Sequence, residues 1–558
     1  MARTSLLRSF ELLAAEHRAA DRLGVTPAEV RAREADARAQ AAESGGPRIS
    51  RRAFLAGGTA AGAALALGGP PSVALGATPS IVIVGGGIAG LSCALGLSDK
   101  GVGATIYESS NRIGGRMHSD SSATRGGTGY WADAQVTEWG GELIDTGHKT
   151  VQALAQRFKL PLDDLLGAEP NSSEDTYKFF GSYYTKAEAD IDFKAIHHAL
   201  QTDVGAASYP TTFEINTAAG IELDNTSIYD WIETRVPGGH RSPLGALLDD
   251  AYNIEFGAET TDQSSLNLCY LLGYNASPGN FSMFGGSDER YHIRGGNQQL
   301  PERIAAALEA KRPGSIQRGW RMTSIARSGS AYALTFDTAP GSRSITADHV
   351  VLALPFAVLR NLNTRKAGFD DLKQTAIESL GRGHNGKLNV QFDRRLWNET
   401  GAWPGISNGS AYADTGFQNT WDVSRAQPGV SGILVDYTGG KVTDSIASAT
   451  ARADASSSTQ VVTATNKFLA QIDPVYPGLK ARWNGRATLS LPHLDPNFNC
   501  SYSFWRVGQC STIGGYEGRR QGNIHFAGEH TSVDFQGWME GGAITGVRAA
   551  SEILADLK

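Results

Sequence analysis

A short apolar run followed by closely spaced glycines is the feature that most constrains the fold of this chain. Residues 79–97 read PSIVIVGGGIAGLSCALGL, a pattern typical of a strand that turns tightly into a helix. Gly85, Gly87 and Gly90 have the spacing G-x-G-x-x-G. The first glycine allows the turn, the second lets a pyrophosphate approach the backbone, and the third lets the helix pack on the strand. The segment therefore predicts an α/β fold that binds a dinucleotide at a helix N-terminus.

The next predicted strand, ATIYE, narrows the choice of dinucleotide. It ends at Glu108, which follows the glycines within the same predicted unit. A carboxylate in this position accepts hydrogen bonds from a ribose diol and repels a 2′-phosphate. This disfavours NADP and leaves FAD and NAD open.

A second glycine and arginine loop follows directly, with the sequence SSNRIGGRMHS over residues 109–119. Gly115 permits close backbone approach, while Arg112 and Arg116 carry forked donors that suit pyrophosphate or flavin oxygens. An NAD dehydrogenase has no need of this second loop. A solvated, glycine-rich surface turn is the alternative interpretation.

With these motifs the sequence resembles the flavin-containing amine oxidase family, whose members carry E-x-x-x-R-x-G-G-R after the glycine fingerprint. The closing stretch IHFAGEHTSVDFQGWMEGGAITGVRAA, residues 524–550, is similar to the last FAD motif of that family. The resemblance covers about residues 78–558 and implies a Rossmann-like, discontinuous FAD-binding domain joined to an α+β substrate domain. The expected FAD-binding segments are 78–150, 285–355 and 486–558, and the expected substrate segments are 151–284 and 356–485.

The resemblance also implies how FAD is held. Glu529 would bind the ribityl chain, and Met539 would offer its backbone amide to the flavin near a final helix that starts at about Gly541. Glycines at a helix start cost about 1 kcal/mol each relative to alanine, so they indicate close approach of the cofactor. The apolar stripe expected to face the sheet is Ile544, Val547, Ala550, Ile553 and Leu557. The other expected cofactor contacts are Gly140, Gly141, Glu142, Met322 and Gly528.

Three residues carry the expected chemistry, again by resemblance. Lys387 matches the lysine that hydrogen-bonds a water beside flavin N5, and Tyr502 and Trp538 match two facing aromatic residues that guide an amine to the flavin. A solvated lysine and two core aromatics are the alternative interpretations. Ser501 stands where some relatives attach FAD covalently, so we expect a noncovalent flavin.

The implied reaction is oxidation of a C–N bond by hydride transfer to flavin N5, followed by hydrolysis of the imine. Dioxygen would then reoxidise the flavin and give hydrogen peroxide. Glu142 near the flavin favours a cationic amine over an amino acid. An L-amino-acid oxidase stays open, because Arg294 or Arg321 could hold a carboxylate. A catalytically idle flavoprotein and a C–C desaturase of the same fold are two further alternatives.

Residues 1–77 read as a leader. Arg51 and Arg52 in ISRRAFL precede a weakly apolar alanine and glycine run, which resembles a twin-arginine signal cleaved near residues 74–77. A transmembrane anchor is disfavoured, because the run is short and diluted by glycine. We therefore expect passage through the twin-arginine translocase and a periplasmic or secreted protein.

Composition excludes several classes of partner and site. A net charge of −6 with 19% charged residues gives no sign of a nucleic-acid groove. The four cysteines lack CxxC spacing, so free buried thiols are expected, although Cys500 and Cys510 could pair. The histidines show no ligand spacing, so no metal is predicted. The sequence leaves a homodimer open.

Local patterns predict elements of the substrate domain. Ser242 followed by Pro243 starts a helix that stops at Gly257, by the usual capping preferences. Residues 176–186, TYKFFGSYYTK, have the alternation and turn glycine of a hairpin. GKLNVQF reads as a strand and STQVVTATNKFLAQI as a helix.

Overall fold

The computed structural model describes residues 79–558, and these residues form one compact unit. The predicted leader lies outside the described residues, so the export signal stays a prediction. None of the helices within residues 79–558 combines the length and the apolar character that crossing a bilayer requires.

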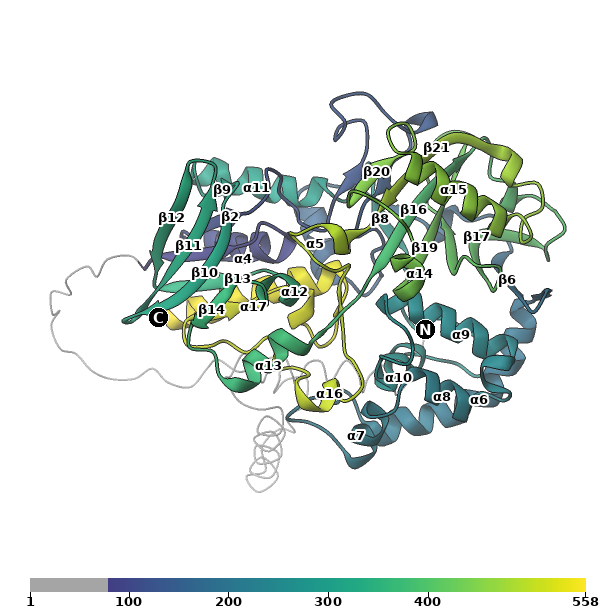
Figure 1. Ribbon diagram of the computed structural model, residues 1–558, viewed down its shortest axis with the longest axis horizontal. Helices are drawn as coiled ribbons and strands as arrows, with labels where there is room; N and C mark the ends of the chain where they lie inside the picture. Colours follow the sequence, from purple (N-terminus) through teal and green to yellow (C-terminus); the bar gives the residue numbers. More distant parts are fainter. Residues whose placement is uncertain (1–78) are drawn as a thin grey trace, which may run out of the picture. The chain divides into compact units, whose positions relative to one another are not determined.

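A parallel sheet of five strands carries the glycine-rich turn (Figure 1). Its strand order is β23-β13-β1-β2-β9, and each neighbouring pair is parallel. The strands are β23 (Ile524–Phe526), β13 (His349–Leu352), β1 (Ile81–Val84), β2 (Thr105–Glu108) and β9 (Ile316–Arg318). Parallel sheets are covered on both faces, which explains why β1 is a continuous run of buried apolar residues.

Alternate side chains of β1 enter two different cores, as the period of two along a strand requires. Ile81 and Ile83 pack with a layer of helices, whereas Val82 and Val84 pack with a four-stranded sheet of order β12-β11-β10-β14. The helices of that layer are α4 (Ile88–Asp99), α5 (Lys149–Arg157), α11 (Gln299–Lys311) and α17 (Met539–Asp556). The strands of the second sheet are β10 (Arg321–Ser328), β11 (Ala331–Thr338), β12 (Gly341–Ala347) and β14 (Asn363–Lys366).

One residue predicted to contact the cofactor, Met322, has its side chain in the core between the parallel sheet and the four-stranded sheet. Met322 lies on β10, where its side chain is 3% exposed and packs among the apolar residues between the two sheets. It is not among the residues that line the cofactor cavity described below. The alternation of β10 turns this side chain inward, so Met322 is a core residue.

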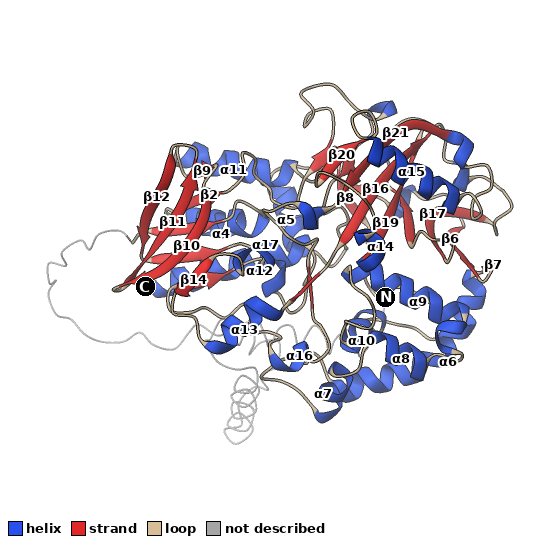
Figure 2. Ribbon diagram, in the orientation of Figure 1, coloured by secondary structure: helices blue, strands red, loops and turns tan. Residues whose placement is uncertain are grey.

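An eight-stranded mixed sheet forms the other main layer, with the order β20-β21-β16-β19-β18-β17-β6-β7 (Figure 2). Its strands are β6 (Ser173–Phe179), β7 (Ser182–Tyr184), β16 (Asn385–Phe392), β17 (Ile406–Ala413), β18 (Asn419–Asp422), β19 (Gly432–Gly439), β20 (Arg452–Asp454) and β21 (Trp483–Ser490). The helices grouped near it are α6 (Lys186–Ala207), α8 (Ile228–Arg235), α9 (Pro243–Phe256), α10 (Ser265–Leu272) and α15 (Thr459–Ile472).

The local predictions for this part of the chain are confirmed. The Ser242 hydroxyl caps α9 by accepting a hydrogen bond from Gly245 N at 3.1 Å, and Gly257 ends the helix with φ +64°. Strands β6 and β7 form the predicted hairpin. GKLNVQF lies in β16, and the last predicted helix is α15.

Gly542 and Gly546 of α17 pack against α4, and Gly542 also lines the cavity of the candidate active site. A Cβ on Gly546 would lie 2.1 Å from Ala89 O, and one on Gly542 would lie 2.8 Å from Ile88 Cγ2. They therefore let α17 pack closely on α4. The predicted apolar stripe was also misplaced, because Val547 and Leu557 are exposed and the buried stripe includes Ala543, Ala549, Ala550 and Ile553.

The proposed division into two domains stays a prediction. All five strands of the parallel sheet come from segments assigned to the FAD-binding domain. The predicted boundary between residues 485 and 486 falls inside β21, and β14 joins the four-stranded sheet although it was assigned to the substrate domain. Those two boundaries therefore need to move.

Candidate active site

A cavity of about 660 Å³ lies where the two main sheets approach each other. Residues that follow β1, β2, β13 and β23 line one part of it, which places it at the carboxyl ends of the parallel strands. Ligands of open α/β sheets bind at that edge. Side chains of β16 to β19 line another part. Every predicted site residue lines this cavity except Gly90 and Met322.

The glycine turn leaves no room for side chains. Gly85 has φ +109°, and a Cβ there would lie 2.5 Å from Ala353 O. A Cβ on Gly115 would lie 3.2 Å from the Cα of Gly87, so the two glycine loops touch through their backbones. Gly90 lies outside the cavity, where a Cβ would meet Gly85 O at 2.1 Å. This matches its predicted role in packing the helix on the strand.

Glu108 is held at the end of β2 by backbone donors. Its Oε2 accepts a hydrogen bond from Gly86 N at 2.7 Å, and its Oε1 accepts one from Ser110 N at 2.8 Å. A carboxylate oxygen has more than one lone pair, so both oxygens can still accept from a diol. The carboxylate lines the cavity, and its ribose contact stays a prediction.

Positive charge gathers beside this turn. Burial and the neighbouring Arg452 guanidinium lower the pKa of Arg112 to about 10. Arg452 comes from β20 and pairs with Asp495 at 2.9 Å. Two close guanidinium groups favour an anion between them, and a pyrophosphate is such an anion. Arg452 was missed because no motif marks it, and only the fold brings it to the glycine loops.

Arg116 and Glu529 form an ion pair inside the cavity wall. Arg116 Nη1 lies 2.9 Å from Glu529 Oε1 and also donates to Ser501 O at 2.8 Å. Burial by itself raises the pKa of Glu529, but the Arg116 guanidinium outweighs it and leaves that pKa below its ordinary value. Gly537 N donates to Glu529 Oε2 at 2.9 Å. The carboxylate is therefore ionised and ties the last FAD motif to the second glycine loop.

The backbone of residues 140 and 141 closes tightly on its neighbours. A Cβ on Gly140 would lie 2.1 Å from Arg116 O, and one on Gly141 would lie 2.9 Å from Met539 Sδ. Gln536, in the same wall, has both side-chain polar atoms buried without a partner among residues 79–558. A buried amide without partners is costly, so these atoms fit a polar ligand. The glycine cradle, the arginines and the unpaired amide together fit a dinucleotide.

Lys387 points into the cavity from β16 and is 8% exposed. Its Nζ lies 2.6 Å from Glu142 Oε2 and donates to Gly140 O at 2.9 Å. Burial raises the pKa of Glu142, but Lys387 and a hydrogen bond from Trp421 Nε1 at 2.9 Å more than offset this and lower it. The predicted catalytic lysine and the predicted cofactor contact are thus one buried ion pair.

Aromatic rings surround this ion pair. The rings of Trp421 and Tyr437 lie 5.0 Å apart, and Lys387 Nζ lies 5.3 Å from the Trp421 centroid. Tyr502 donates its hydroxyl hydrogen to Glu255 O at 2.6 Å and accepts one from Tyr437 at 2.9 Å. Trp538 lines the same cavity as the N-cap residue of α17. The structure therefore brings the predicted aromatic pair into one cavity and adds Trp421 and Tyr437, which the sequence did not reveal.

Two carboxylates face the cavity without any partner. Within residues 79–558, the side chains of Glu255 and Glu289 form neither a hydrogen bond nor an ion pair, although both line the cavity. Burial and the charge of Asp145 raise the pKa of Glu289 to about 8. Burial and the charge of Glu289 raise the pKa of Glu255 well above its ordinary value. Tyr412, 3% exposed, also lines this part, and its hydroxyl has no hydrogen-bond partner among the described residues.

The arginines considered for an amino-acid substrate lie elsewhere. Arg294 pairs with Asp163 and is 66% exposed, and Arg321 donates to Asn497 Oδ1. Neither lines the cavity. Arg425 does line it, but its guanidinium is paired with Glu169 at 2.6 Å.

The cysteines follow the expectation of free buried thiols. Cys500 is 2% exposed and does not line the cavity, whereas Ser501 does. Burial raises the pKa of the Cys500 thiol to about 11, which keeps it protonated and unreactive. The noncovalent attachment of the flavin stays a prediction.

Several known proteins are similar to this chain in sequence or in architecture. Polyamine oxidase 2 of Arabidopsis thaliana is 23% identical over 482 residues, which cover 85% of this chain and 88% of that protein. An L-amino-acid oxidase of Echis ocellatus is 24% identical over 59% of this chain and 62% of its own length. Cyclohexylamine oxidase from Brevibacterium oxydans IH-35A superposes with a TM-score of 0.70 at 18% identity, covering 86% of this chain and 99% of the other.

The family profile matched over most of the chain is described as "Flavin containing amine oxidoreductase", and it matches residues 88–554. The matched span begins directly after Gly87 and includes most of the residues that line the cavity, from Ile88 to Gly542 in the first turn of α17. FAD is accordingly the cofactor, and the reaction class is oxidation of CH–NH or CH–NH2 groups. The chain belongs to the flavin-containing amine oxidoreductase family.

Proposed function

We propose that this enzyme oxidises a cationic amine in preference to an amino acid, with dioxygen as electron acceptor. The observation that carries the choice is the pair of unpartnered carboxylates, Glu255 and Glu289, in the cavity wall. Both are partly buried, and a carboxylate that is partly withdrawn from water without a partner is costly unless a ligand supplies the opposite charge. An ammonium group supplies that charge, whereas the carboxylate of an amino acid would be repelled.

The residues that would hold FAD follow from the cradle. Gly87 and Gly115 would let the pyrophosphate reach the backbone, with Arg112 and Arg452 as its cationic neighbours, and Glu108 would accept from the ribose. When bound, FAD accepts a hydride at N5 from the carbon that bears the amine. These contacts fix where the reacting carbon has to be placed.

The chain's own residues would prepare the amine for this step. The Lys387–Glu142 pair is buried, so it keeps a fixed dipole in a region that excludes bulk water. Tyr437, Tyr502 and Trp538 offer aromatic faces that attract a cationic or neutral amine and orient it. Orientation and water exclusion are the protein's contribution to catalysis.

A second ammonium group on the substrate would account for two carboxylates rather than one. Glu255 lies on α9 and Glu289 lies before β8 (Tyr291–Ile293), so neither is part of the Lys387–Glu142 pair. A diamine would place one nitrogen near the aromatic residues and the other near these carboxylates. The similarity to polyamine oxidases supports a substrate with more than one amine.

Steady-state kinetics on matched substrates test the proposal. The expected order of kcat/KM is 1,4-diaminobutane above butylamine, and butylamine above L-ornithine, measured by peroxide release. In Glu289→Gln the ratio of diamine to monoamine kcat/KM should fall at least about 10-fold, the loss of roughly 1.4 kcal/mol of charge recognition. Glu378→Gln, a change at an exposed glutamate, should leave the ratio unchanged. Turnover of L-ornithine alone would establish the amino-acid oxidase alternative instead.

Export and assembly are separate proposals. We propose that residues 1–77 direct the folded protein through the twin-arginine translocase to the periplasm or the medium. The paired Arg51 and Arg52 support it. Replacing both by lysine should retain the enzyme in the cytoplasm on cell fractionation. A homodimer is also proposed, and its test is the mass of the purified enzyme in solution.

A further inference from the structure

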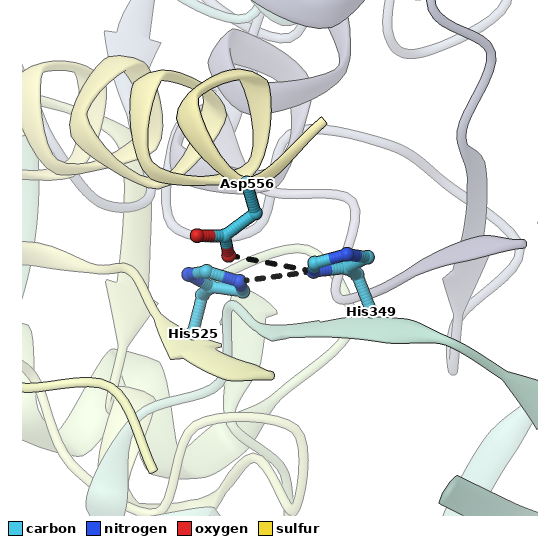
Figure 3. Close-up of side chains that lie close together, drawn as sticks. All are labelled: His349, His525 and Asp556. Atoms are coloured by element: carbon cyan, nitrogen blue, oxygen red, sulfur yellow. Dashed lines mark hydrogen bonds and ion pairs between the residues drawn. The ribbon is translucent and has the colours of Figure 1, made fainter. Parts of the chain in front are cut away.

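Two histidines and an aspartate meet at the end of α17, away from the cavity (Figure 3). His349 is the first residue of β13, His525 lies in β23, and Asp556 is the last residue of α17. His349 Nδ1 lies 3.4 Å from His525 Nε2 and 4.0 Å from Asp556 Oδ2. The three ligand atoms all lie within 4.8 Å of one another. None of these residues lines the cofactor cavity.

A fourth residue, Glu552, orients the ring of His525. Nδ1 of His525 lies 2.6 Å from Glu552 Oε2. In the neutral tautomer whose Nδ1 donates to this carboxylate, Nε2 has the lone pair that a metal ion needs. A histidine that donates its other ring nitrogen to a carboxylate is the arrangement found around metal-bound imidazoles.

The contact between the two imidazoles is a long hydrogen bond. Their nitrogens are 3.4 Å apart, whereas ordinary N–H donors lie about 2.7–3.2 Å from their acceptors. Both rings are nevertheless buried, with 6% of His349 and 0% of His525 exposed. Two nitrogen ligands at about 2.0–2.1 Å from a tetrahedral ion are about 3.3 Å apart, which is close to the observed spacing.

We propose that His349, His525 and Asp556 bind one divalent transition-metal ion of the zinc class. Imidazole nitrogens with one carboxylate select zinc, cobalt or nickel over magnesium and calcium, which take oxygen ligands. Water would complete the coordination, because Asp556 is the exposed member of the group. The sequence predicted no metal, since the three ligands come from separate elements and share no motif.

The surrounding charges favour a cation with one exception. The site lies at the C-terminal end of an 18-residue helix, where the helix dipole is negative. Asp348 and Glu552 add negative charge, and Arg548 pairs with Glu552 at 3.4 Å. The exception is Arg520, whose Nη1 lies 2.5 Å from Asp556 Oδ2 and competes for the same oxygen. This competition predicts that removing Arg520 tightens metal binding.

A second histidine group is less suited to a metal. His384, His493 and Asp444 also lie close together, but the two rings stack at 4.5 Å with an interplanar angle of 12°. The lone pairs of an imidazole lie in the ring plane, so rings stacked face to face point them in parallel rather than toward one ion. The rings of His349 and His525 are also close to parallel, at 26°, but their centroids lie 5.7 Å apart and their nitrogens face each other edge to edge. Asp444 therefore provides the matched control.

The location indicates a structural role. Helix α17 begins beside the cofactor cavity and ends at this group, about 27 Å away at 1.5 Å per residue. A metal ion here would attach the last turn of α17 to two strands of the parallel sheet. The cofactor cavity does not reach the group, so the expected effect is on stability.

Zinc titration of the FAD-loaded full chain, first treated with EDTA and dialysed, tests the proposal by calorimetry. One zinc ion per chain should bind, and binding should weaken at least 10-fold in Asp556→Asn and in Glu552→Gln. Binding should tighten in Arg520→Gln and stay unchanged in Asp444→Asn. An excess of zinc about 100-fold above Kd should raise Tm by about 3 °C in the wild type.

Three outcomes would overturn the proposal. The wild type could take up no zinc at micromolar concentrations. Asp556→Asn could bind as tightly as the wild type, or Asp444→Asn could be the variant that loses binding. Asp556 and Arg520 are both partly exposed, so these two variants should fold, which their flavin spectra would verify.

Discussion

Replacing Glu289 by glutamine should stabilise the fold while it weakens diamine recognition. Burial and Asp145 raise the pKa of Glu289 from 4.5 to about 8 in the folded enzyme. Between these pH values the unfolded chain releases the proton and the folded chain keeps it, which favours unfolding. Each pH unit above 4.5 lowers the free energy of unfolding by about 1.4 kcal/mol. The largest loss that Glu289 can cause at pH 7 is therefore about 3 kcal/mol.

The sign of the pH dependence follows from the raised pKa. Glu289 does not lower the stability of the wild type below pH 4.5. Its destabilising effect grows as the pH rises from 4.5 to about 8 and is constant above pH 8. Glutamine cannot ionise, so the stability of the variant does not decrease over this pH range for this reason. The stability gain of Glu289→Gln should therefore be small at pH 5 and reach about 1–3 kcal/mol at pH 8.

Thermal unfolding of the FAD-loaded enzyme, followed at pH 5 and pH 8, measures the effect. Glu289→Gln should have a higher Tm than the wild type at pH 8, by about 2 °C or more, and nearly the same Tm at pH 5. Glu378→Gln, at an exposed position, should follow the wild type at both pH values. A Glu289→Gln variant that is less stable at pH 8, or equally shifted at both pH values, would refute the reasoning.

Three further changes test other parts of the site. Glu142→Gln leaves Lys387 without its charge partner. The rate constant of anaerobic flavin reduction should therefore fall about 10- to 100-fold, while the flavin content of the purified protein stays normal. Arg112→Met removes a cation beside the glycine turn, so the purified protein should have a lower ratio of absorbance at 450 nm to that at 280 nm. Gly115→Val puts a Cβ 3.2 Å from the Cα of Gly87 at φ +55°, so it should yield protein without flavin, and full flavin content would contradict the assigned cradle.

The nucleotide end of the site could be predicted because its requirements are local. Gly85, Gly87 and Gly90 act within one turn, and Glu108 ends the next strand, so their spacing in the sequence is their spacing in the fold. The second loop, with Arg112 and Arg116, follows directly. Gly85 and Gly90 leave no room for a side chain, because an added Cβ would lie 2.5 Å or 2.1 Å from a backbone oxygen, whereas the cofactor contacts of these residues stay a prediction.

The substrate end could not be predicted in the same way. Glu255 ends a helix, Glu289 precedes a short strand, and Tyr412 lies on β17, so only the tertiary fold brings them together. Without a motif, a glutamate reads as a solvated surface charge. The glycines of α17 were predicted only in part. Their clustering suggested contact with the cofactor, and Gly542 does line the cavity, but Gly542 and Gly546 also let α17 pack closely on α4, which the sequence did not reveal.

The charges along the cavity explain why one space can hold two different ligands in a fixed order. Arg112 and Arg452 make the nucleotide end positive, and Glu255 and Glu289 make the far end acidic. A dinucleotide carries its negative charge on the pyrophosphate, so it can enter in only one favourable orientation. A cationic amine is attracted to the opposite end, and its uncharged nitrogen is left near the Lys387 pair. An amine with a single nitrogen cannot be charged at one end and uncharged at the other, which is why the proposed substrate carries two amine groups.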